Sequence, residues 1–229
     1  SVAGLWWLYP LPSLIFFLVI SALHFGSSDI RHISPPSSKD AWVPLIAHGG
    51  LVTIAIPVLQ SSSVEPLFAA LVGTESSLWL VKQINQLRLP WAACLFAYVI
   101  YSVYQPRWRK SLLSLSVLIA LAYLLPPLVS FALYFCLWHS RSHMQRIWRN
   151  IAQADRRRSA NETLIYSLLA YAAAGVYFVL QTDTASASVT AITPALLQLT
   201  FIGLAALTVP HMVLVDFIHG QQQEDQQHD

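Results

Sequence analysis

Long apolar segments without charged residues constrain this chain more than any other feature. Several segments run for 17 or more residues without a charge, which is about the length that a helix needs to cross a bilayer. Only 10% of the 229 residues are charged, whereas a soluble domain carries about 25%. We therefore predict an all-α fold, a polytopic membrane bundle of about six or seven transmembrane helices.

The predicted helices follow one another in a single integral membrane domain, residues 1–220, before a polar, disordered tail at 221–229. They span residues 5–25, 42–59, 89–104, 111–125, 127–143, 163–181 and 193–218. Pro126 and Pro127 separate the fourth and fifth as a tight hairpin, because proline breaks helical hydrogen bonding. The segment 64–80 is apolar but is interrupted at 73–77, so it either crosses the membrane or lies re-entrant or interfacial.

Lysine and arginine predict the orientation, because cytoplasmic loops are enriched in both. If 64–80 does not cross, eleven of these residues lie in the loops at 31–41, 105–110 and 141–158, and only Lys82 and Arg88 lie on the other side. If it crosses, the split weakens to nine against four. The first topology is favoured. We expect a multi-pass protein of the inner (plasma) membrane, and the net charge of +2 does not suggest nucleic acid as a partner.

Five of the eight histidines lie in or at the ends of predicted helices: His24, His48, His139, His143 and His211. Ionisable residues inside a membrane are costly and are therefore functional candidates. In the favoured topology all five lie towards the cytoplasmic side. His139 and His143 are four residues apart, so they share one helix face and could bind one metal ion.

A set of imidazoles without a cysteine or carboxylate cluster suits iron, copper or zinc. Asp29 and Asp216 each follow a histidine by five residues, about 140° around a helix. Each is therefore a candidate metal ligand or a group that orients a histidine of a neighbouring helix. The alternative is that the histidines are hydrogen-bonded core residues, or that His139 and His143 form a basic interfacial collar with Arg141 and Arg146.

Aromatic residues form two stripes, which are usually packing or an interfacial belt. They could also line a tunnel for a flat, apolar ligand that enters from the lipid. The candidates are Tyr98, Tyr101, Phe131, Tyr134, Phe135 and Trp138. Cys94 and Cys136 lie in apolar segments and are expected to be small core residues without a disulfide.

Four motifs occur in the order seen in a known family. Residues 24–29 resemble its His-Phe-Gly-x-x-Asp motif, and residues 47–49 resemble its Ala-His-Gly element. Residues 134–143 are similar to its Tyr-Phe…His-Ser-x-x-His motif, and residues 208–212 to its Thr-x-Pro-His-Met element. The family is the bacteriorhodopsin-related-protein-like (Brp/Blh) β-carotene 15,15′-dioxygenases.

The resemblance implies an integral membrane enzyme with an Fe(2+) cofactor. Such an enzyme cleaves the central double bond of β-carotene with O₂ to give two all-trans-retinal, which commonly serve a microbial rhodopsin. His24, His139 and His143 match the motif positions that bind iron, whereas His48 and His211 match further motif positions. No catalytic side chain beyond the metal ligands is required. The family's earlier Pro-His-Gly-x-x-Asp motif has no match in residues 1–23, and the chain begins without methionine, so we expect an upstream helix to be missing.

Two other classes of function stay open from the residues alone. One is a different histidine-ligated membrane metalloenzyme, such as a desaturase or hydroxylase, although those generally use adjacent histidine pairs that this chain lacks. The other is a non-enzymatic haem-binding or transport protein.

Overall fold

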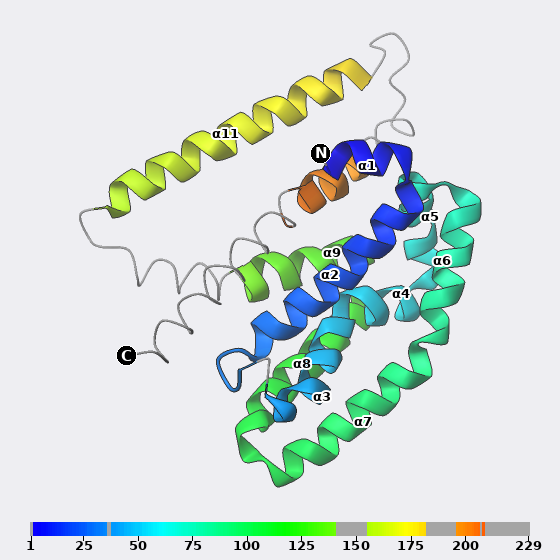
Figure 1. Cartoon of the computed structure of the whole chain (residues 1–229), viewed down its shortest axis with the longest axis vertical. Coiled ribbons are helices and arrows are strands. Elements are labelled where there is room, and N and C mark those ends of the chain that lie inside the picture. The colour runs from blue at the N-terminus through cyan, green and yellow to red at the C-terminus, as the bar shows by residue number, and fades with distance from the viewer. Residues whose placement is uncertain (1, 36–37, 141–154, 182–195, 207, 209–229) are drawn as a thin grey trace.

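Helices account for every regular element in the part of the chain that the structure describes (Figure 1). This computed structural model describes residues 2–35, 38–140, 155–181, 196–206 and 208. Within them, three helical stretches are long and apolar enough to cross a membrane: Pro10–Ile30, Lys39–Leu59 and Thr74–Tyr104. Shorter apolar helices are Ser61–Val72, Pro127–His139 and Leu196–Ala206. The predicted all-α class is confirmed.

The first half of the chain runs down α2, back through α3 and α4, and over a hairpin. Its elements are α1 (Val2–Leu8), α2 (Pro10–Ile30), η1 (Lys39–Ala41), α3 (Trp42–Gly50), the π-helical η2 (Leu51–Ala55), α4 (Ile56–Leu59), α5 (Ser61–Val72) and α6 (Thr74–Gln86).

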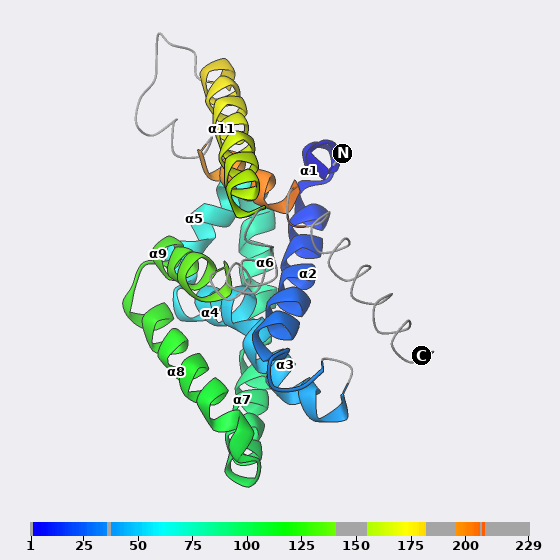
Figure 2. The same ribbon diagram turned by 90° about the vertical axis from the view of Figure 1, so that its left-hand side faces the viewer.

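The second half continues from α6 and returns along the same bundle. Its elements are α7 (Arg88–Tyr104), η3 (Pro106–Trp108), α8 (Arg109–Leu124), α9 (Pro127–Ala132), the π-helical η4 (Leu133–His139) and α11 (Arg156–Gln181). The view turned by 90° shows α7 and α8 as adjacent helices that meet at one end of the bundle (Figure 2).

The first predicted span, 5–25, is placed wrongly at both ends. The chain breaks between α1 and α2 at Tyr9, and α2 starts at Pro10 because proline favours the first position of a helix. Nothing in the sequence stops α2 before Ile30, so the helix continues past residue 25. Asp29 therefore lies inside the helix, and His24 lies more than one turn before its end.

The segment 64–80 folds back on itself at Gly73. This residue has a φ of 84°, a conformation that side chains with a Cβ rarely adopt, and it joins α5 to α6. The Ser77 hydroxyl donates to the Glu65 carbonyl oxygen at 2.6 Å and ties the two helices together. Because the chain returns here, the loops before α3 and after α7 lie at the same end of the bundle. Arg107 and Asp40 form an ion pair of 2.6 Å between them, as the favoured topology requires.

Two prolines end α8 and start α9, as predicted. Leu125 is extended because it precedes Pro126. The carbonyl groups left unpaired at the end of α8 are satisfied from outside the helix, as helix ends require. The Gln60 amide donates to the carbonyl oxygens of Ala122 and Leu125. The Ser130 hydroxyl lies within hydrogen-bond distance of the Leu125 carbonyl oxygen and of that of Leu121, which also accepts from the Leu125 N–H.

Glycines bring α2 and α3 into backbone contact. A Cβ at Gly26 would overlap the Leu45 carbonyl oxygen, and a Cβ at Gly49 would overlap the Ala22 carbonyl oxygen. Such close approach is typical of helices that pack through small residues. The two glycines lie two residues after His24 and one after His48, so the contact sets those histidines on facing helices.

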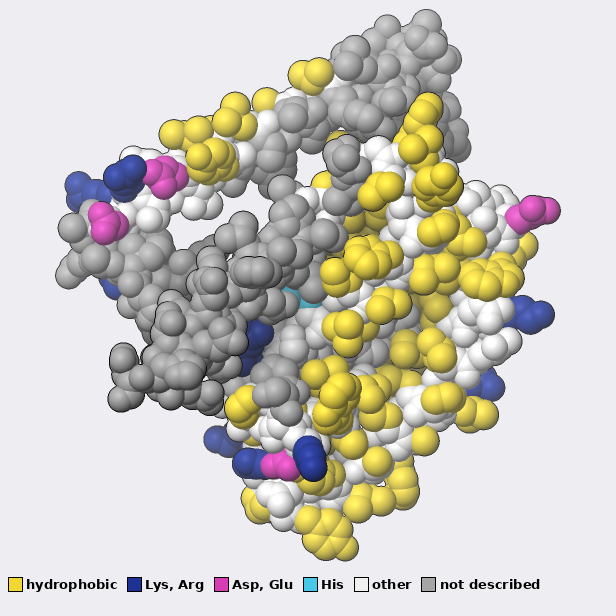
Figure 3. Space-filling view, in the orientation of Figure 1, with side chains coloured by type: hydrophobic (Ala, Val, Ile, Leu, Met, Phe, Trp, Pro, Cys, Tyr) yellow, Lys and Arg dark blue, Asp and Glu magenta, His cyan; other side chains and the backbone are white. Residues whose placement is uncertain are grey.

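Buried apolar side chains form two clusters along the bundle. One lies around Leu14, Phe17 and Phe68, and the other around Phe25 and Trp108. The outer face over α2, α6 and α7 is also largely apolar, with charged side chains mainly at its margins (Figure 3). Cys94 is half-buried and Cys136 is exposed, so the expectation of two core cysteines is wrong for Cys136; both thiols are free.

The structure describes only part of the last two predicted spans. Residues 163–181 lie within α11, a 26-residue helix with exposed leucines. From the span 193–218, the structure describes the helix Leu196–Ala206, where Gln198 donates to the Ala70 carbonyl oxygen at 2.7 Å. The tail 221–229, with His228, and His219 lie outside the described residues.

We expect Gly49→Ala to destabilise the protein, because the new methyl group would push α3 away from the Ala22 carbonyl. Overpacking of this kind costs about 1–3 kcal/mol, which lowers the melting temperature by on the order of 5 °C for a chain of this size. Gly175→Ala in α11 is the matched control, since a Cβ there meets nothing within 4 Å. Thermal unfolding in detergent gives the melting temperatures of both variants. Equal melting temperatures for Gly49→Ala and Gly175→Ala would contradict the close packing of α2 and α3.

Candidate functional site

A buried carboxylate, that of Asp29, lies where α2, α3 and η4 meet. Its side chain is 5% exposed. The Tyr134 hydroxyl donates a hydrogen bond of 3.0 Å to Oδ2. The Nδ1 atom of His48 lies 3.5 Å from Oδ2, and that of His139 lies 3.7 Å from Oδ1. The two histidine distances exceed an ordinary N–H···O bond, so these are electrostatic contacts. Three groups from two other elements therefore compensate one buried carboxylate.

His48 is engaged at both ring nitrogens. Its side chain is 2% exposed, and Nε2 lies 2.9 Å from the Ser111 hydroxyl at the start of α8. Nε2 and the Ser111 hydroxyl thus share a hydrogen bond, while Nδ1 faces the Asp29 carboxylate. The ring also packs against Tyr98, with 5.9 Å between centroids. His48 is thus placed to hold Asp29 and has no ring nitrogen left for a metal ion in this arrangement.

His139 also directs Nδ1 at the carboxylate, but its Nε2 has no counterpart of the Ser111 contact among the described residues. Phe25 packs edge-on against its ring at 4.8 Å, and Phe135 stacks on it at 6.0 Å. An imidazole that presents Nδ1 to a carboxylate keeps Nε2 for a metal ion, which is the usual arrangement of metal-binding histidines. The His24 ring lies edge-on to that of His139, with 5.1 Å between centroids.

The π-helical turn of η4 explains why Tyr134 and His139 both reach Asp29. Residues five apart on an α-helix lie about 140° apart around the axis. In a π-helix the hydrogen bonds join residues five apart, so those residues lie about one turn from each other. The N–H of Ser140 donates to the Phe135 carbonyl in this pattern. π-Helical turns occur frequently at functional sites.

The structure brings together three of the predicted histidines, His24, His48 and His139. Asp29 faces the histidines of neighbouring helices, as its five-residue offset from His24 predicts. His143, His211 and Asp216 lie outside the described residues, and the loop residue His32 is exposed. In the described ranges, no group of three histidine, cysteine or acidic side chains is close enough to hold a metal ion. The described residues that could contribute ligands are His24 and His139.

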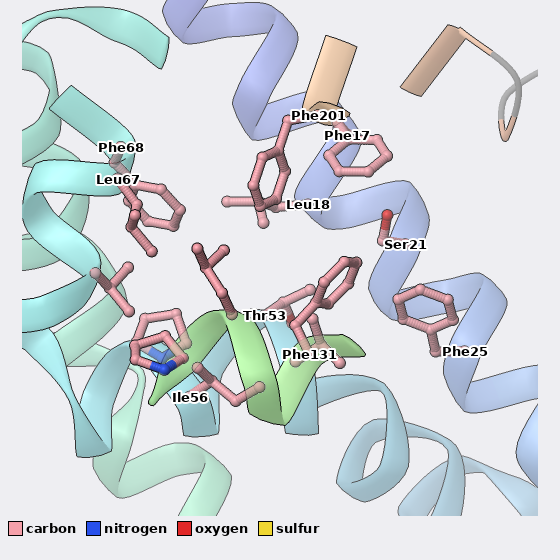
Figure 4. Close-up of a pocket in the computed structure, with 15 residues that line it drawn as sticks. Phe17, Leu18, Ser21, Phe25, Thr53, Ile56, Leu67, Phe68, Phe131 and Phe201 are labelled. Carbon is pink, nitrogen blue, oxygen red and sulfur yellow. The ribbon is translucent and has the colours of Figure 1, made fainter. Parts of the chain in front are cut away.

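An apolar cavity lies beside Phe25 (Figure 4), whose ring contacts His139. Its cavity volume is about 60 Å³, and the cavity is open to the surface on one side. Its aromatic lining residues are Phe17, Phe25, Phe68, Phe131 and Phe201. Phe25 both lines the cavity and contacts His139, so it joins the two parts of the site.

The six predicted tunnel residues lie in different places relative to this cavity. Phe131 lines the cavity, and Phe135 stacks on Phe131 at 5.8 Å behind it. The other four do not line it. The Tyr134 hydroxyl binds Asp29, and the rings of Tyr98 and Tyr101 pack against Trp108. Trp138 is 40% exposed. These four side chains therefore lie outside this cavity, because side chains on one helix point in several directions.

Several residues of the site were not predicted from the sequence. Ser111 is one of many serines in apolar segments, and nothing local distinguishes it. Phe17, Phe68 and Phe201 come from segments far apart in the chain. The glycines after His24 and His48 carried a usable signal, because small residues in apolar helices mark close contacts.

Known proteins with a described activity are similar to this chain. A sequence profile of the family described as "Beta-carotene 15,15′-dioxygenase" matches residues 1–219. The β-carotene 15,15′-dioxygenase of uncultured marine bacterium 66A03 is 38% identical over 217 residues, which are 93% of this chain and 74% of that protein. No solved structure shows significant similarity to the chain.

We expect Asp29 and Tyr134 to be energetically coupled. A hydrogen bond to a charged group contributes about 1.5–3 kcal/mol, so Asp29→Asn and Tyr134→Phe should each destabilise the protein and the double variant should not add their costs. Unfolding by denaturing detergent measures the stability of the wild type, the two single variants and the double variant. The pair Asp40→Asn and Arg107→Gln is the control, since that ion pair is exposed and worth about 0–1 kcal/mol. Additive costs at the buried pair would contradict the coupling.

Proposed function

Because the chain belongs to the β-carotene 15,15′-dioxygenase family, we propose that it cleaves the central 15,15′ double bond of β-carotene with O₂. Two molecules of all-trans-retinal are the products. One oxygen atom enters each new carbonyl group, so the reaction needs no external electron donor. The observation that carries this proposal is the contact of one residue, Phe25, with both the apolar cavity and the histidine cluster.

The cavity suits a hydrocarbon substrate. β-Carotene has no hydrogen-bonding atom, so its binding depends on burial of apolar surface, worth about 25 cal/mol per Å². Phenylalanine rings from α2, α5, α9 and the helix Leu196–Ala206 surround the space (Figure 4). The side chains of this wall exclude water from the polyene and direct it past Phe25 towards His24 and His139.

The donor chemistry of the site fits iron(II). Imidazole nitrogens are ligands that iron accepts, and His139 keeps Nε2 for it. We propose His24 and His139 as ligands together with His143, which follows His139 by four residues. Bound iron supplies the chemistry of O₂. The protein's part is to hold the imidazoles, through Asp29, Tyr134 and His48, and to exclude water from the reacting double bond.

We further propose a multi-pass location in the inner (plasma) membrane, with the histidine cluster towards the cytoplasm. Three described helices are long and apolar enough to cross. The basic loops before α3 and after α7 lie together at one end of the bundle, where cytoplasmic loops carry lysine and arginine. β-Carotene is a hydrocarbon and dissolves in the lipid bilayer, so an enzyme within the membrane can bind it directly from the lipid. The retinal would then be available to a microbial rhodopsin.

Expression in a bacterial strain that accumulates β-carotene tests the activity. We expect the orange colour to fade while all-trans-retinal appears in extracts. His24→Ala and His139→Ala should each abolish the product, because the site loses a ligand. His32→Ala is the matched control, since His32 is exposed. Unchanged pigment with the wild-type protein expressed and supplied with iron would refute the proposal. Oxygenated or desaturated lipid beside intact carotenoid would instead support a desaturase or hydroxylase.

Iron analysis of the purified protein separates ligands from the residues that hold them. We expect His24→Ala, His139→Ala and His143→Ala to lose bound iron with the helical content retained. His48→Ala and Asp29→Asn should weaken iron binding about 10–100-fold without removing it, as loss of a supporting group usually does. Elemental analysis after dialysis against graded chelator measures this. Iron retained in both His24→Ala and His139→Ala would overturn the ligand assignment.

A further inference from the structure

One hydroxyl group in the wall of the apolar cavity has no hydrogen-bond partner in the part of the chain that the structure describes. Ser21 is 3% exposed, and its Oγ makes no hydrogen bond to any described residue. Buried hydroxyls normally have a partner. Its side chain lies on the cavity side of α2, between Phe17 and Phe25 (Figure 4).

The buried hydroxyls of Thr53 and Ser102 behave differently. Thr53, which lines the same cavity, donates to the Gly49 carbonyl oxygen at 3.1 Å, and Ser102 donates to the Tyr98 carbonyl oxygen at 2.8 Å. Both use the carbonyl group four residues earlier, which is the usual partner for a hydroxyl on a helix. Ser21 does not use the equivalent carbonyl of Phe17, so its hydroxyl stays available to a ligand.

The position of Ser21 indicates which ligand atom it would meet. It precedes His24 and Phe25 by about one helical turn, and the Phe25 ring touches that of His139. Ser21 therefore lies near the end of the cavity that adjoins the histidine cluster. Phe68 and Leu67 of α5 lie across the cavity from α2 (Figure 4).

We propose that Ser21 is the binding group for the carbonyl oxygen of a polyene aldehyde in this cavity. This inference rests on the proposed function and extends it to the product. The hydrocarbon substrate has no atom that can accept a hydrogen bond. Cleavage creates one carbonyl per product at the histidine end, within reach of a hydroxyl that has no other partner. Ser21 thereby distinguishes the product from the substrate.

Binding of all-trans-retinal to the purified full chain, without iron or O₂, tests the role of Ser21. Quenching of tryptophan fluorescence gives the dissociation constant. We expect Ser21→Ala to weaken retinal binding roughly fivefold, the usual contribution of one neutral hydrogen bond. The hydrocarbon retinoid with a methyl group in place of the aldehyde should bind both proteins equally. Ser21→Thr, which keeps the hydroxyl, should retain retinal affinity.

Thr53→Val is the matched control, because it removes a hydroxyl of the same cavity that is already bonded; retinal affinity should not change. The infrared carbonyl stretch of bound retinal should shift towards that of a free aldehyde only in Ser21→Ala. Equal retinal affinity in wild type and Ser21→Ala would overturn the inference, as would equal weakening of both ligands. Since no turnover is involved, failure of carotenoid cleavage in cells would instead count against the proposed function.

Discussion

A carboxylate buried in an apolar bundle places the strongest physical demand on this fold. Removing an unpaired charge from water is costly, so the surrounding helices must supply partners. Asp29 on α2 meets Tyr134 and His139 from η4 and His48 from α3. The partners of one side chain therefore fix how three separate elements lie relative to one another.

Two features of the backbone make this arrangement possible. Gly26 and Gly49 let α2 and α3 touch, since a side chain at either position would meet a carbonyl oxygen. The π-helical turn of η4 then directs Tyr134 and His139 to the same carboxylate. Without the first feature His48 would lie farther from Asp29, and without the second only one of the two η4 residues could reach it.

The division between polar and apolar parts of the site has a chemical meaning for oxidative cleavage. His48, His139 and Tyr134 all meet at Asp29, whereas the neighbouring cavity is walled mainly by phenylalanines and aliphatic side chains. Phe25 belongs to both. A hydrocarbon can thus lie in the apolar part while its reacting bond reaches the imidazoles. Ser21 and Thr53 are the hydroxyl-bearing side chains in the wall, and only that of Ser21 has no described partner; its position fits the polar atom that the reaction introduces.

Residues close together in the chain were the ones most reliably interpreted from sequence. Pro126 and Pro127 predicted the break between α8 and α9, and the offset between His24 and Asp29 predicted that the carboxylate serves other helices. The start of α2 was predicted wrongly, and of the six candidate tunnel residues only Phe131 lines the cavity. The helix boundary depended on a local break at Tyr9, and the direction of each aromatic side chain depended on which neighbouring helix it met.

The sequence by itself determined the all-α class, the apolar helices, the candidate histidines and the family, because composition, spacing and motifs are properties of the chain. Only the tertiary structure decided that Ser111 holds His48, that His48 faces a carboxylate rather than keeping a nitrogen for a metal ion, and that five distant phenylalanines enclose one cavity. These depend on contacts between segments as far apart as residues 17 and 201. Such contacts arise from the packing of whole helices, which local pattern does not encode.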